Sequence, residues 1–498
     1  MVYNFNLGIG WASSGVEYAQ SYRGIALRKS GIPAKFIFTD MFPRDPLEHM
    51  TKNLYFEDDE IIWLYTFFTD FKIAPVTYTK EDLEKTFPSE DYTYTREGKV
   101  GTYRFHSGDI FYRAYFTDYE QDFIHRVEYV SGGNLIRKDY FSYARMYTEY
   151  YAPENNKAKC YMRRFYNTDG TTAYEEVKEE DREEATYHFP DRIIDSKTEL
   201  VGYMIDELHV TENDYVLMDR TTFLGQIVLE HARPAKIGVV IHADHYSKGV
   251  TNEDYILWNN YYENAFRLNR FIDFYIVSTD QQRTLLLEQF EKYNGVTPKI
   301  ITIPVGSLPR LRYPSEPRKR YSMLTASRLA AEKHCDYDIK ACVKVHEALP
   351  DITLDIYGEG KEKTELSNLI HKYNAENYIR LMGQHNLEDV YKKYELYLTA
   401  SRSEGFGLSL LEAIGSGLPI VGFDVPYGNP TFVDEGQNGH LFKYDEYTSE
   451  TDKVQALANM IIKIFTEDDI ESFHQHSYDV ASKYLDEEVR DKWAHLFQ

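Results

Sequence analysis

A glycine-rich turn and the start of a helix are encoded by Ser401-Arg402-Ser403-Glu404-Gly405-Phe406-Gly407-Leu408-Ser409-Leu410-Leu411-Glu412-Ala413-Ile414-Gly415-Ser416-Gly417-Leu418-Pro419. Leu408, Leu411 and Ile414 have the spacing of one buried helix face. Glu412, which stands eight positions after Glu404, must therefore face another way. The segment predicts two carboxylates near the start of one helix.

The chemistry of this turn favours a nucleotide-sugar as its ligand. Gly405 and Gly407 allow the backbone to approach a bound molecule closely. The N-terminus of the following helix presents free N–H groups and the positive end of the helix dipole, which bind phosphate oxygens. Carboxylates that accept hydrogen bonds from sugar hydroxyls complete such a site.

Composition excludes several classes of protein. The chain has 498 residues, which predicts two to four domains of about 150 residues each. Its net charge is −24, with 80 acidic and 56 basic residues, so it does not resemble a nucleic-acid binder or a binder of anionic membranes. A local basic cleft remains compatible with this charge.

Compartment signals favour the cytoplasm. The three cysteines, Cys160, Cys335 and Cys342, form neither a C-x-x-C motif nor an even disulfide framework. No apolar run approaches 18 residues, and the first residues have no signal-peptide pattern. We expect a cytoplasmic protein with at most peripheral contact with the inner face of the cell membrane.

The first part of the chain has α/β character with a β-rich insertion. A capping box, Ser14-Gly15-Val16-Glu17, predicts a helix over residues 14–29. A helical stretch is also expected over residues 253–268. Strands are expected at residues 2–7, 35–39, 61–68, 215–218, 237–242, 274–278 and 300–303. Between them, Tyr- and Phe-rich segments separated by turns predict an antiparallel meander with strands at 100–106, 110–117, 123–129, 159–166 and 172–177.

A proline-rich stretch, residues 304–319, reads as a linker to a second α/β series. Its strands are expected at residues 322–326, 353–357, 379–382, 396–400 and 419–423, and its last helices at 452–465, 470–484 and 487–496. The predicted domains are an N-terminal Rossmann-like acceptor domain (1–76 plus 196–305), the inserted β-meander (77–195), a C-terminal Rossmann-like nucleotide-sugar domain (306–480), and a C-terminal helix (481–498) that crosses back to the N-terminal domain. Ligands of open α/β sheets bind at the carboxyl ends of the strands, so we expect a site in a cleft between the two sheets.

A basic loop follows the first strand of the second series. Arg328 and Lys333 stand at the expected carboxyl end of that strand. Two cations there suit a diphosphate, because Arg offers a bidentate fork and Lys a point charge. A solvated basic loop is the alternative reading of the same residues.

These motifs resemble the retaining glycosyltransferases of family 4, which have the GT-B fold. That family carries an Arg and a Lys five positions apart after the first strand, and an E-x7-E motif around a G-F-G turn, as Arg328/Lys333 and Glu404/Glu412 do here. A closer resemblance, over essentially the whole chain, is to the glycosyltransferase A family of accessory Sec systems, which attaches the first sugar to serine-rich repeat adhesins. It is carried by the segments 6–17, 133–141, 252–260 and 422–429.

The resemblance implies a role for each matching residue. Glu412 is expected to bind the ribose of UDP, and Glu404 to lie beside the donor sugar. Arg328 and Lys333 are expected to bind the diphosphate. Further donor contacts are expected from the backbone N–H groups of Phe406, Gly407 and Leu408 and from Ser14 and Gly15 at the first helix start. A buried, paired helix acid is the alternative for Glu412.

His242 ends a predicted strand, where family 4 enzymes have a His that faces the donor sugar. A structural His is the alternative, and His242, Asp244 and His245 also have a spacing that metals use, although family 4 needs no metal. We therefore expect no cofactor besides the UDP-sugar donor. Asp336-Tyr337-Asp338 matches the D-x-D of a different fold and reads as structural, in the first turn of a helix.

The predicted activity is retaining transfer of glucose or N-acetylglucosamine from a UDP-sugar to Ser or Thr of an adhesin. The sequence does not separate the two donors. The Tyr-rich insertion reads as sheet core, and the resemblance implies that it also contacts the acceptor or a GT-B-like partner subunit. Self-association is the alternative to a partner subunit. The alternative functions are a non-catalytic acceptor-binding subunit and a membrane lipid glucosyltransferase. The four donor-site residues Arg328, Lys333, Glu404 and Glu412 are all present, which favours the enzyme.

Overall fold

The computed structural model describes residues 1–9, 15–106, 108–179 and 182–497. Ser14, for which a donor contact and a helix cap are predicted, lies outside them. The chain forms two compact units, residues 1–17, 33–239 and 270–272 in the first and 18–32, 240–269 and 273–498 in the second. This division follows packing density rather than sheet membership, so the domain boundaries given above stay predictions.

The α/β start of the chain forms a seven-stranded sheet, and the strands predicted for it are confirmed within about one residue, apart from the third. Its order is β17-β16-β15-β14-β1-β2-β3. The first unit contributes parallel pairs between β1 and β2, β1 and β14, β14 and β15, and β2 and β3, and β16 pairs with β17 in the same sense. The bounds are β1 (Val2–Asn6), β2 (Ala34–Phe38), β3 (Ile61–Trp63), β14 (Tyr215–Met218), β15 (Lys236–Ile241), β16 (Phe274–Val277) and β17 (Ile300–Thr302).

Helices connect these strands as expected for an α/β fold. Helix α1 (Gly15–Lys29) follows β1, as predicted for the described residues. The others include α2 (Leu47–Lys52), α5 (Lys197–Glu207), α6 (Gly225–His231), α7 (Glu263–Arg267) and α8 (Asp280–Gln289).

The strand predicted over residues 61–68 is wrong in its second half. β3 ends at Trp63, and the one-turn helix α3 (Leu64–Phe67) follows. The indole N–H of Trp63 donates to the carbonyl of Asp40 at 2.8 Å, so the chain is fixed where the strand stops. A short apolar run does not distinguish a strand from a buried helical turn.

The helix predicted over residues 253–268 is also wrong in most of its length, because only α7 forms. The side-chain oxygen of Asn252 accepts from the backbone N–H groups of Asp254 (3.0 Å) and Tyr255 (3.1 Å). Such an Asx turn competes with helix formation. The preceding residues 246–258 form a loop that is closed by a bridge between Tyr246 and Trp258.

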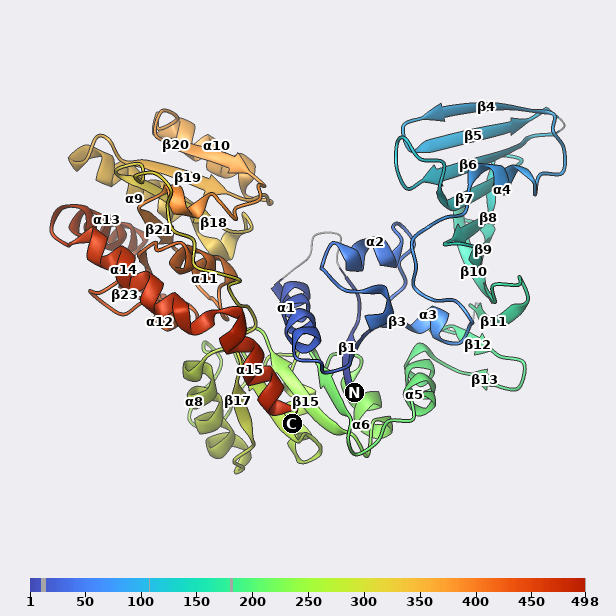
Figure 1. Ribbon diagram of the computed structural model, residues 1–498, viewed down its shortest axis with the longest axis horizontal. Coiled ribbons are helices and arrows are strands. Elements are labelled where there is room, and N and C mark those ends of the chain that lie inside the picture. Colours follow the sequence, from blue (N-terminus) through green and yellow to red (C-terminus); the bar gives the residue numbers. More distant parts are fainter. Residues whose placement is uncertain (10–14, 107, 180–181, 498) are drawn as a thin grey trace. The chain divides into compact units, whose positions relative to one another are not determined.

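The Tyr-rich insertion is an antiparallel meander, as predicted. Ten strands follow one another in chain order across a single sheet (Figure 1). They are β4 (Tyr92–Glu97), β5 (Val100–Phe105), β6 (Ile110–Phe116), β7 (Ile124–Ser131), β8 (Asn134–Phe141), β9 (Arg145–Glu154), β10 (Lys157–Tyr166), β11 (Thr172–Val177), β12 (Thr186–His188) and β13 (Ile193–Ile194). Helix α4 (Lys80–Glu84) packs Leu83 into the core between β5 and β7.

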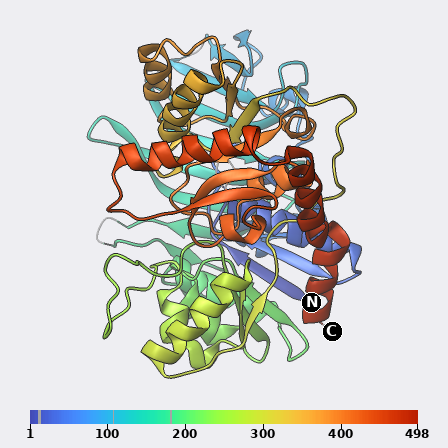
Figure 2. The same cartoon turned by 90° about the vertical axis from the view of Figure 1, so that its left-hand side faces the viewer.

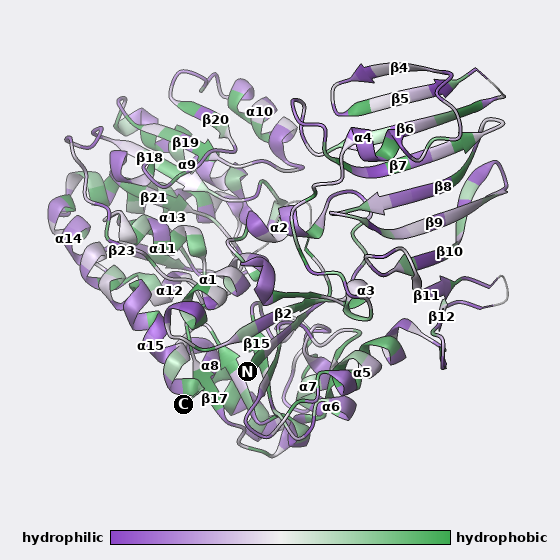
Figure 3. Cartoon of the chain, turned by 45° about the vertical axis from the view of Figure 1, so that its right-hand side comes forward, coloured by the Kyte–Doolittle hydropathy of each residue, from purple (hydrophilic) through white to green (hydrophobic). Residues whose placement is uncertain are grey.

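Aromatic stacking joins the meander to the rest of the first unit. Successive strands contribute rings at short centroid distances, with Tyr147 and Tyr140 at 4.3 Å and Phe165 and Tyr174 at 4.5 Å. Tyr65 of α3 stacks on Phe165 at 5.7 Å. The prediction that these aromatic residues form sheet core is confirmed, and Figure 3 shows the alternation of hydrophobic and hydrophilic residues along the strands.

The second unit contains a six-stranded parallel sheet in the order β20-β19-β18-β21-β22-β23. The strands are β18 (Ser322–Ala326), β19 (Thr353–Tyr357), β20 (Ile379–Gly383), β21 (Leu396–Thr399), β22 (Ile420–Asp424) and β23 (Gly439–Lys443). The five predicted strands are confirmed within about one residue, and β23 was not predicted. The chain order reverses between β18 and β21, the type of position at which open α/β sheets bind ligands.

Helices cover this sheet, and the predicted final helices are present. Figure 2 shows α13 (Glu450–Thr466) lying across the sheet, and its apolar residues share a core with α9 (Cys335–Ala348). The others are α10 (Lys363–Lys372), α11 (Leu408–Gly415), α12 (Asn429–Phe432), α14 (Ile470–Ala481) and α15 (Asp486–Leu496). α15 returns to α1 within this unit, where Asp486 pairs with Lys29 at 2.8 Å and Arg23 lies 5.5 Å from the ring centre of Trp493.

The Asp336-Tyr337-Asp338 triplet lies in the first turn of α9, as predicted. Asp338 is 1% exposed, and neither of its carboxylate oxygens has a hydrogen-bond partner among the described residues. Burial holds the pKa of Asp338 well above its usual range. Burial alone would also raise the pKa of Asp336, but hydrogen bonds from His334 and Lys340 lower it.

These two neighbours should give opposite pH trends in stability. The folded-state pKa of Asp338 is raised, so folding favours its protonated form. The contribution of this form to the stability of the fold is complete below the unfolded pKa of about 4 and is lost as the pH rises towards the folded pKa. Asp338→Asn should therefore gain stability relative to the native chain as the pH rises, by up to about 1.4 kcal/mol per pH unit. Urea unfolding between pH 5 and pH 8 measures this trend.

Asp336→Asn is the matched control. The pKa of Asp336 is lowered, so its contribution is present above the unfolded pKa and is lost only as the pH falls through the folded value. This variant should be less stable than the native chain at pH 8. A stability difference for Asp338→Asn that does not change with pH would contradict the assignment.

Candidate functional site

Glu404 lies in the loop between β21 and α11, at the carboxyl edge of the six-stranded sheet. Its backbone carbonyl accepts hydrogen bonds from the N–H groups of Tyr427 and Gly428, both at 2.7 Å. This close approach of the two loops requires a glycine at position 428, because a Cβ there would lie 2.3 Å from the carbonyl oxygen of Phe406. The loop after β22 therefore holds the backbone of Glu404 in place.

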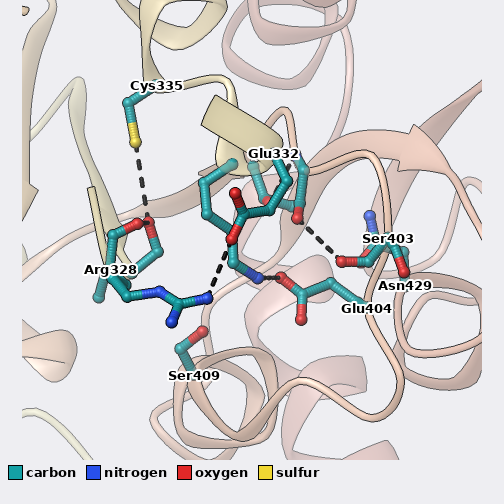
Figure 4. A network of polar contacts seen from close by, with 12 residues as sticks. Arg328, Glu332, Cys335, Ser403, Glu404, Ser409 and Asn429 are labelled. Atoms are coloured by element: carbon teal, nitrogen blue, oxygen red, sulfur yellow. Dashed lines mark hydrogen bonds and ion pairs between the residues drawn. The ribbon is translucent and has the colours of Figure 1, made fainter. Parts of the chain in front are cut away.

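The structure brings Lys333 and Glu404 together. The ammonium of Lys333 donates to the Glu404 carboxylate at 2.5 Å, and their side chains are 19% and 15% exposed (Figure 4). Lys333 ends a one-turn 3-10 helix, Ala331–Lys333, after β18. A half-buried pair of opposite charges at adjacent strand ends can bind an anionic leaving group on one side and a hydroxyl on the other.

Arg328 lies in the same loop with its side chain 71% exposed. Its guanidinium pairs with Glu332 at 3.0 Å (Figure 4). The sequence did not predict this partner, because an i,i+4 spacing indicates a contact only within a helix and Arg328 lies in a loop. The loop packs tightly on the segment after β19, since a Cβ at Gly358 would lie 1.9 Å from the carbonyl oxygen of Ser327. Arg328 is thus a charge open to solvent on a fixed backbone.

Helix α11 begins at the predicted glycine turn. Gly407 has a φ of +87°, the left-handed conformation that glycine adopts without strain, and no side-chain cap among the described residues bonds the helix start. Phe406 is buried and packs its ring 5.0 Å from that of Phe432. The N–H groups of Leu408 and of the residues after it thus lie at the positive end of the helix dipole.

Glu412 lies one turn further along α11 and apart from the Lys333–Glu404 pair. Burial raises the pKa of its carboxyl, and the Tyr391 hydroxyl and the Arg312 guanidinium oppose that shift. Arg312 belongs to the predicted linker, and its backbone N–H donates to the carbonyl of Gly415 at 2.8 Å. The surroundings of Glu412 fit both a hydroxyl-binding carboxylate and the paired helix acid considered above.

His242 follows β15 and comes close to the Glu404 loop. A Cβ at Gly405 would lie 2.5 Å from the carbonyl oxygen of His242, so these two backbones touch. The His242 N–H donates to the hydroxyl oxygen of Tyr262 at 2.8 Å. Gly15 begins α1 in the first unit, and among the described residues no atom lies close enough to require a glycine there.

The metal alternative receives no support from His245. This ring is buried and bonded through Nε2 to Gln289 at 2.7 Å and through Nδ1 to Tyr427 at 3.2 Å. Burial lowers the pKa of His245 to about 4. Within the described ranges no group of three His, Cys, Asp or Glu side chains is placed to hold a metal ion.

Sequence reasoning missed several residues that surround this site. Ser403 donates to Asp244 at 2.6 Å across 159 positions of sequence, and no local pattern indicates such a pair. Asn429 donates to the carbonyl of Phe423 at 2.7 Å, and its buried Oδ1 has no hydrogen-bond partner among the described residues. The Gly428-Asn429-Pro430 tripeptide was the signal that could have indicated a structured turn here.

In the part of the chain that the structure describes, no helix has both the length and the apolar character to span a membrane.

Comparison with known proteins agrees with this architecture. Residues 93–191 match the model of the GtfA extended beta-sheet domain, and residues 312–475 match that of the glycosyl transferases group 1. The GtfA subunit of the UDP-N-acetylglucosamine–peptide N-acetylglucosaminyltransferase from Streptococcus gordonii is 50% identical over 497 residues, which cover 100% of this chain and 98% of that protein.

Two solved structures are similar over the full length. One is the pneumococcal O-GlcNAc transferase GtfA in complex with UDP and GlcNAc, with a TM-score of 0.94, 48% identity and coverage of 100% of this chain and 98% of the other. The second is a GtfA/B complex, with a TM-score of 0.95, 50% identity and coverage of 100% and 99%. Identity of this extent shows that the chain belongs to the GtfA family of glycosyltransferases, with the GT-B fold.

Proposed function

We propose that this chain transfers N-acetylglucosamine from UDP-N-acetylglucosamine to Ser and Thr hydroxyls of a serine-rich repeat adhesin, as the first step of its O-glycosylation. The observation that carries the proposal is the Lys333–Glu404 pair at the strand ends of the second sheet. The choice of sugar, which the sequence left open between glucose and N-acetylglucosamine, follows the names of the relatives, which specify UDP-N-acetylglucosamine.

In this proposal the donor is held by charge and by hydrogen bonds. Arg328 and Lys333 bind the diphosphate together with the N-terminus of α11, and Glu412 binds the ribose hydroxyls. Glu404 and His242 face the sugar. The exposed guanidinium of Arg328 supports its role, because its bidentate fork is accessible to a diphosphate.

Transfer is proposed to retain the configuration of the anomeric carbon. The bond from that carbon to the diphosphate oxygen breaks while a bond to the serine oxygen forms on the same face. The departing phosphate oxygen accepts the proton of the serine hydroxyl. Lys333 and Arg328 stabilise the charge that UDP gains, so side chains supply the positive charge.

The inserted meander is the proposed surface for the acceptor and for a partner subunit. The ten-stranded meander, which matches the GtfA extended beta-sheet domain, is proposed to contact the unfolded acceptor or a GT-B-like partner subunit through its strand edges. A related chain is known from a GtfA/B complex, which supports a hetero-oligomer over self-association. We propose that the enzyme works in the cytoplasm, with at most peripheral contact with the cell membrane.

Replacing either member of the central pair should abolish most transfer without unfolding the protein. Glu404→Gln and Lys333→Ala should each lower kcat by about 100-fold or more, the range seen when one preorganised electrostatic group is lost. Initial rates of transfer to a serine-rich peptide, with UDP-N-acetylglucosamine as donor, measure the effect.

Lys363→Ala is the matched control, because Lys363 also pairs with a glutamate, Glu359, at 2.7 Å, but on the exposed face of α10. This variant should retain normal transfer. Near-normal rates in both Glu404→Gln and Lys333→Ala would refute the assignment of the site. Calorimetric titration of the native chain with UDP separates an enzyme from an acceptor-binding subunit, which would bind none.

The donor can be identified directly. A serine-rich peptide incubated with the chain, with and without a partner subunit, should gain the mass of N-acetylhexosamine from UDP-N-acetylglucosamine and no mass from UDP-glucose. Mass spectrometry measures both reactions, and a peptide with alanine at every Ser and Thr is the control. A hexose gain from UDP-glucose alone would contradict the proposed donor.

A further inference from the structure

Two loops of the second unit are joined beside Glu404 by a short hydrogen bond. One loop follows β15 and contains Asp244, and the other follows β21 and contains Ser403. The Ser403 hydroxyl donates to the Asp244 carboxylate at 2.6 Å, and both side chains are half-buried. Asn259 donates from its side chain to the backbone carbonyl of Asp244 at 2.8 Å, so the backbone that carries the carboxylate is held in place.

A second tether joins Tyr427 to His245. The Tyr427 hydroxyl lies 3.2 Å from Nδ1 of His245, and the two rings are stacked at 5.8 Å. Both residues are buried, with exposed fractions of 1% and 0%. Because burial lowers the pKa of His245 to about 4, the ring is neutral near pH 7. Nε2 then donates to Gln289, and Nδ1 accepts from the tyrosine.

Both tethers act on the backbone that carries Glu404. Ser403 is the residue before it, and the Tyr427 N–H donates to its carbonyl at 2.7 Å. Gly405, the residue after it, lies against the carbonyl of His242 with no space for a side chain. Three consecutive residues are thus fixed to the segment 242–245, which lies more than 150 positions earlier in the chain.

Burial of the ionised Asp244 carboxyl at this position costs free energy. Burial raises its pKa, and the hydrogen bonds from Ser403 and Tyr427 oppose that shift. A half-buried acid costs stability unless its hydrogen bonds are satisfied, and a hydrophobic residue would fill the same space at lower cost. The pair therefore suits a requirement for a defined loop position more than a requirement for stability.

We propose that Asp244 and Ser403 are positioning residues, which hold the carboxylate of Glu404 in register with Lys333. This inference rests on the proposed function. A displacement of about 1 Å at a reacting group can lower a rate about 100-fold, so loss of the tether should act on turnover. UDP affinity should be preserved, because Arg328 and Lys333 belong to the loop after β18, and Glu412 lies inside α11, beyond the tethered residues.

The test compares single and double variants in steady-state kinetics. Ser403→Ala and Asp244→Ala should each lower kcat by about 10- to 100-fold while KM for UDP-N-acetylglucosamine changes less than about 3-fold. The double variant should be no worse than the more impaired single variant, because both remove the same bond. UDP affinity, measured by calorimetry, should stay within about 2-fold of the native value.

Conservative variants separate positioning from folding. Ser403→Thr keeps the hydroxyl and Asp244→Asn keeps an acceptor oxygen, so both should retain most of the native kcat. The matched control is Thr302→Ala, which removes a hydroxyl-to-carboxylate bond of the same 2.6 Å length, to Asp280, outside the proposed site. It should leave kcat unchanged.

The inference is overturned if Ser403→Ala and Asp244→Ala keep the native kcat while Tm falls. It is also overturned if the threonine and asparagine variants are as slow as the alanine variants, or if the double variant shows additive losses. A native chain that binds UDP yet transfers no sugar in any of these assays would refute the proposed function instead, so the two failures are distinguishable.

Discussion

The short contact between the Lys333 ammonium and the Glu404 carboxylate is the interaction around which the second unit is organised. Its two members come from loops 71 positions apart, after β18 and β21. An ion pair with both side chains less than one-fifth exposed loses much of its hydration, so the attraction repays that loss only when the geometry is held by the backbone. The surrounding loops supply that restraint.

Close backbone contacts at glycines provide much of the restraint on the Lys333–Glu404 pair. At Gly358, Gly405 and Gly428 an added Cβ would lie between 1.9 and 2.5 Å from a carbonyl oxygen of a neighbouring loop. Carbonyl oxygens cannot move away as a flexible side chain can, so the loops at the carboxyl edge of the sheet form one rigid layer. These contacts fix the loop that carries Glu404 against its neighbours.

The first unit contains the long antiparallel sheet of the meander, which aromatic stacking and ion pairs stabilise. A row of stacked rings runs across β8, β9, β10 and β11 and continues to Tyr65 in α3. Beside it, Arg163 lies between the buried carboxylates of Glu149 and Glu176, at 2.9 and 2.8 Å. The stacking of Tyr65 on Phe165 ties the meander to α3, while the charge network joins β9, β10 and β11 within the meander itself.

Local patterns in the sequence determined most of the fold and the central part of the site. Alternation, turn residues and apolar runs predicted the meander and, apart from β23, the parallel strands of both sheets, because these signals act over a few residues. Gly405 and Gly407 predicted the turn before α11. Residues 61–68 and 253–268 were misassigned, because an apolar run and an Asx turn are decided by what they pack or bond against.

Only the tertiary structure decided which chemistry-bearing residues meet. It paired Lys333 with Glu404, turned Arg328 toward Glu332, and brought Asp244 to Ser403. Each of the longer-range contacts joins residues separated by 71 positions or more, and their geometry depends on strand order and on loop backbones that touch at glycines. A local sequence pattern carries no information about such distances. The relative positions of loops at different strand ends are set only when the whole unit is packed.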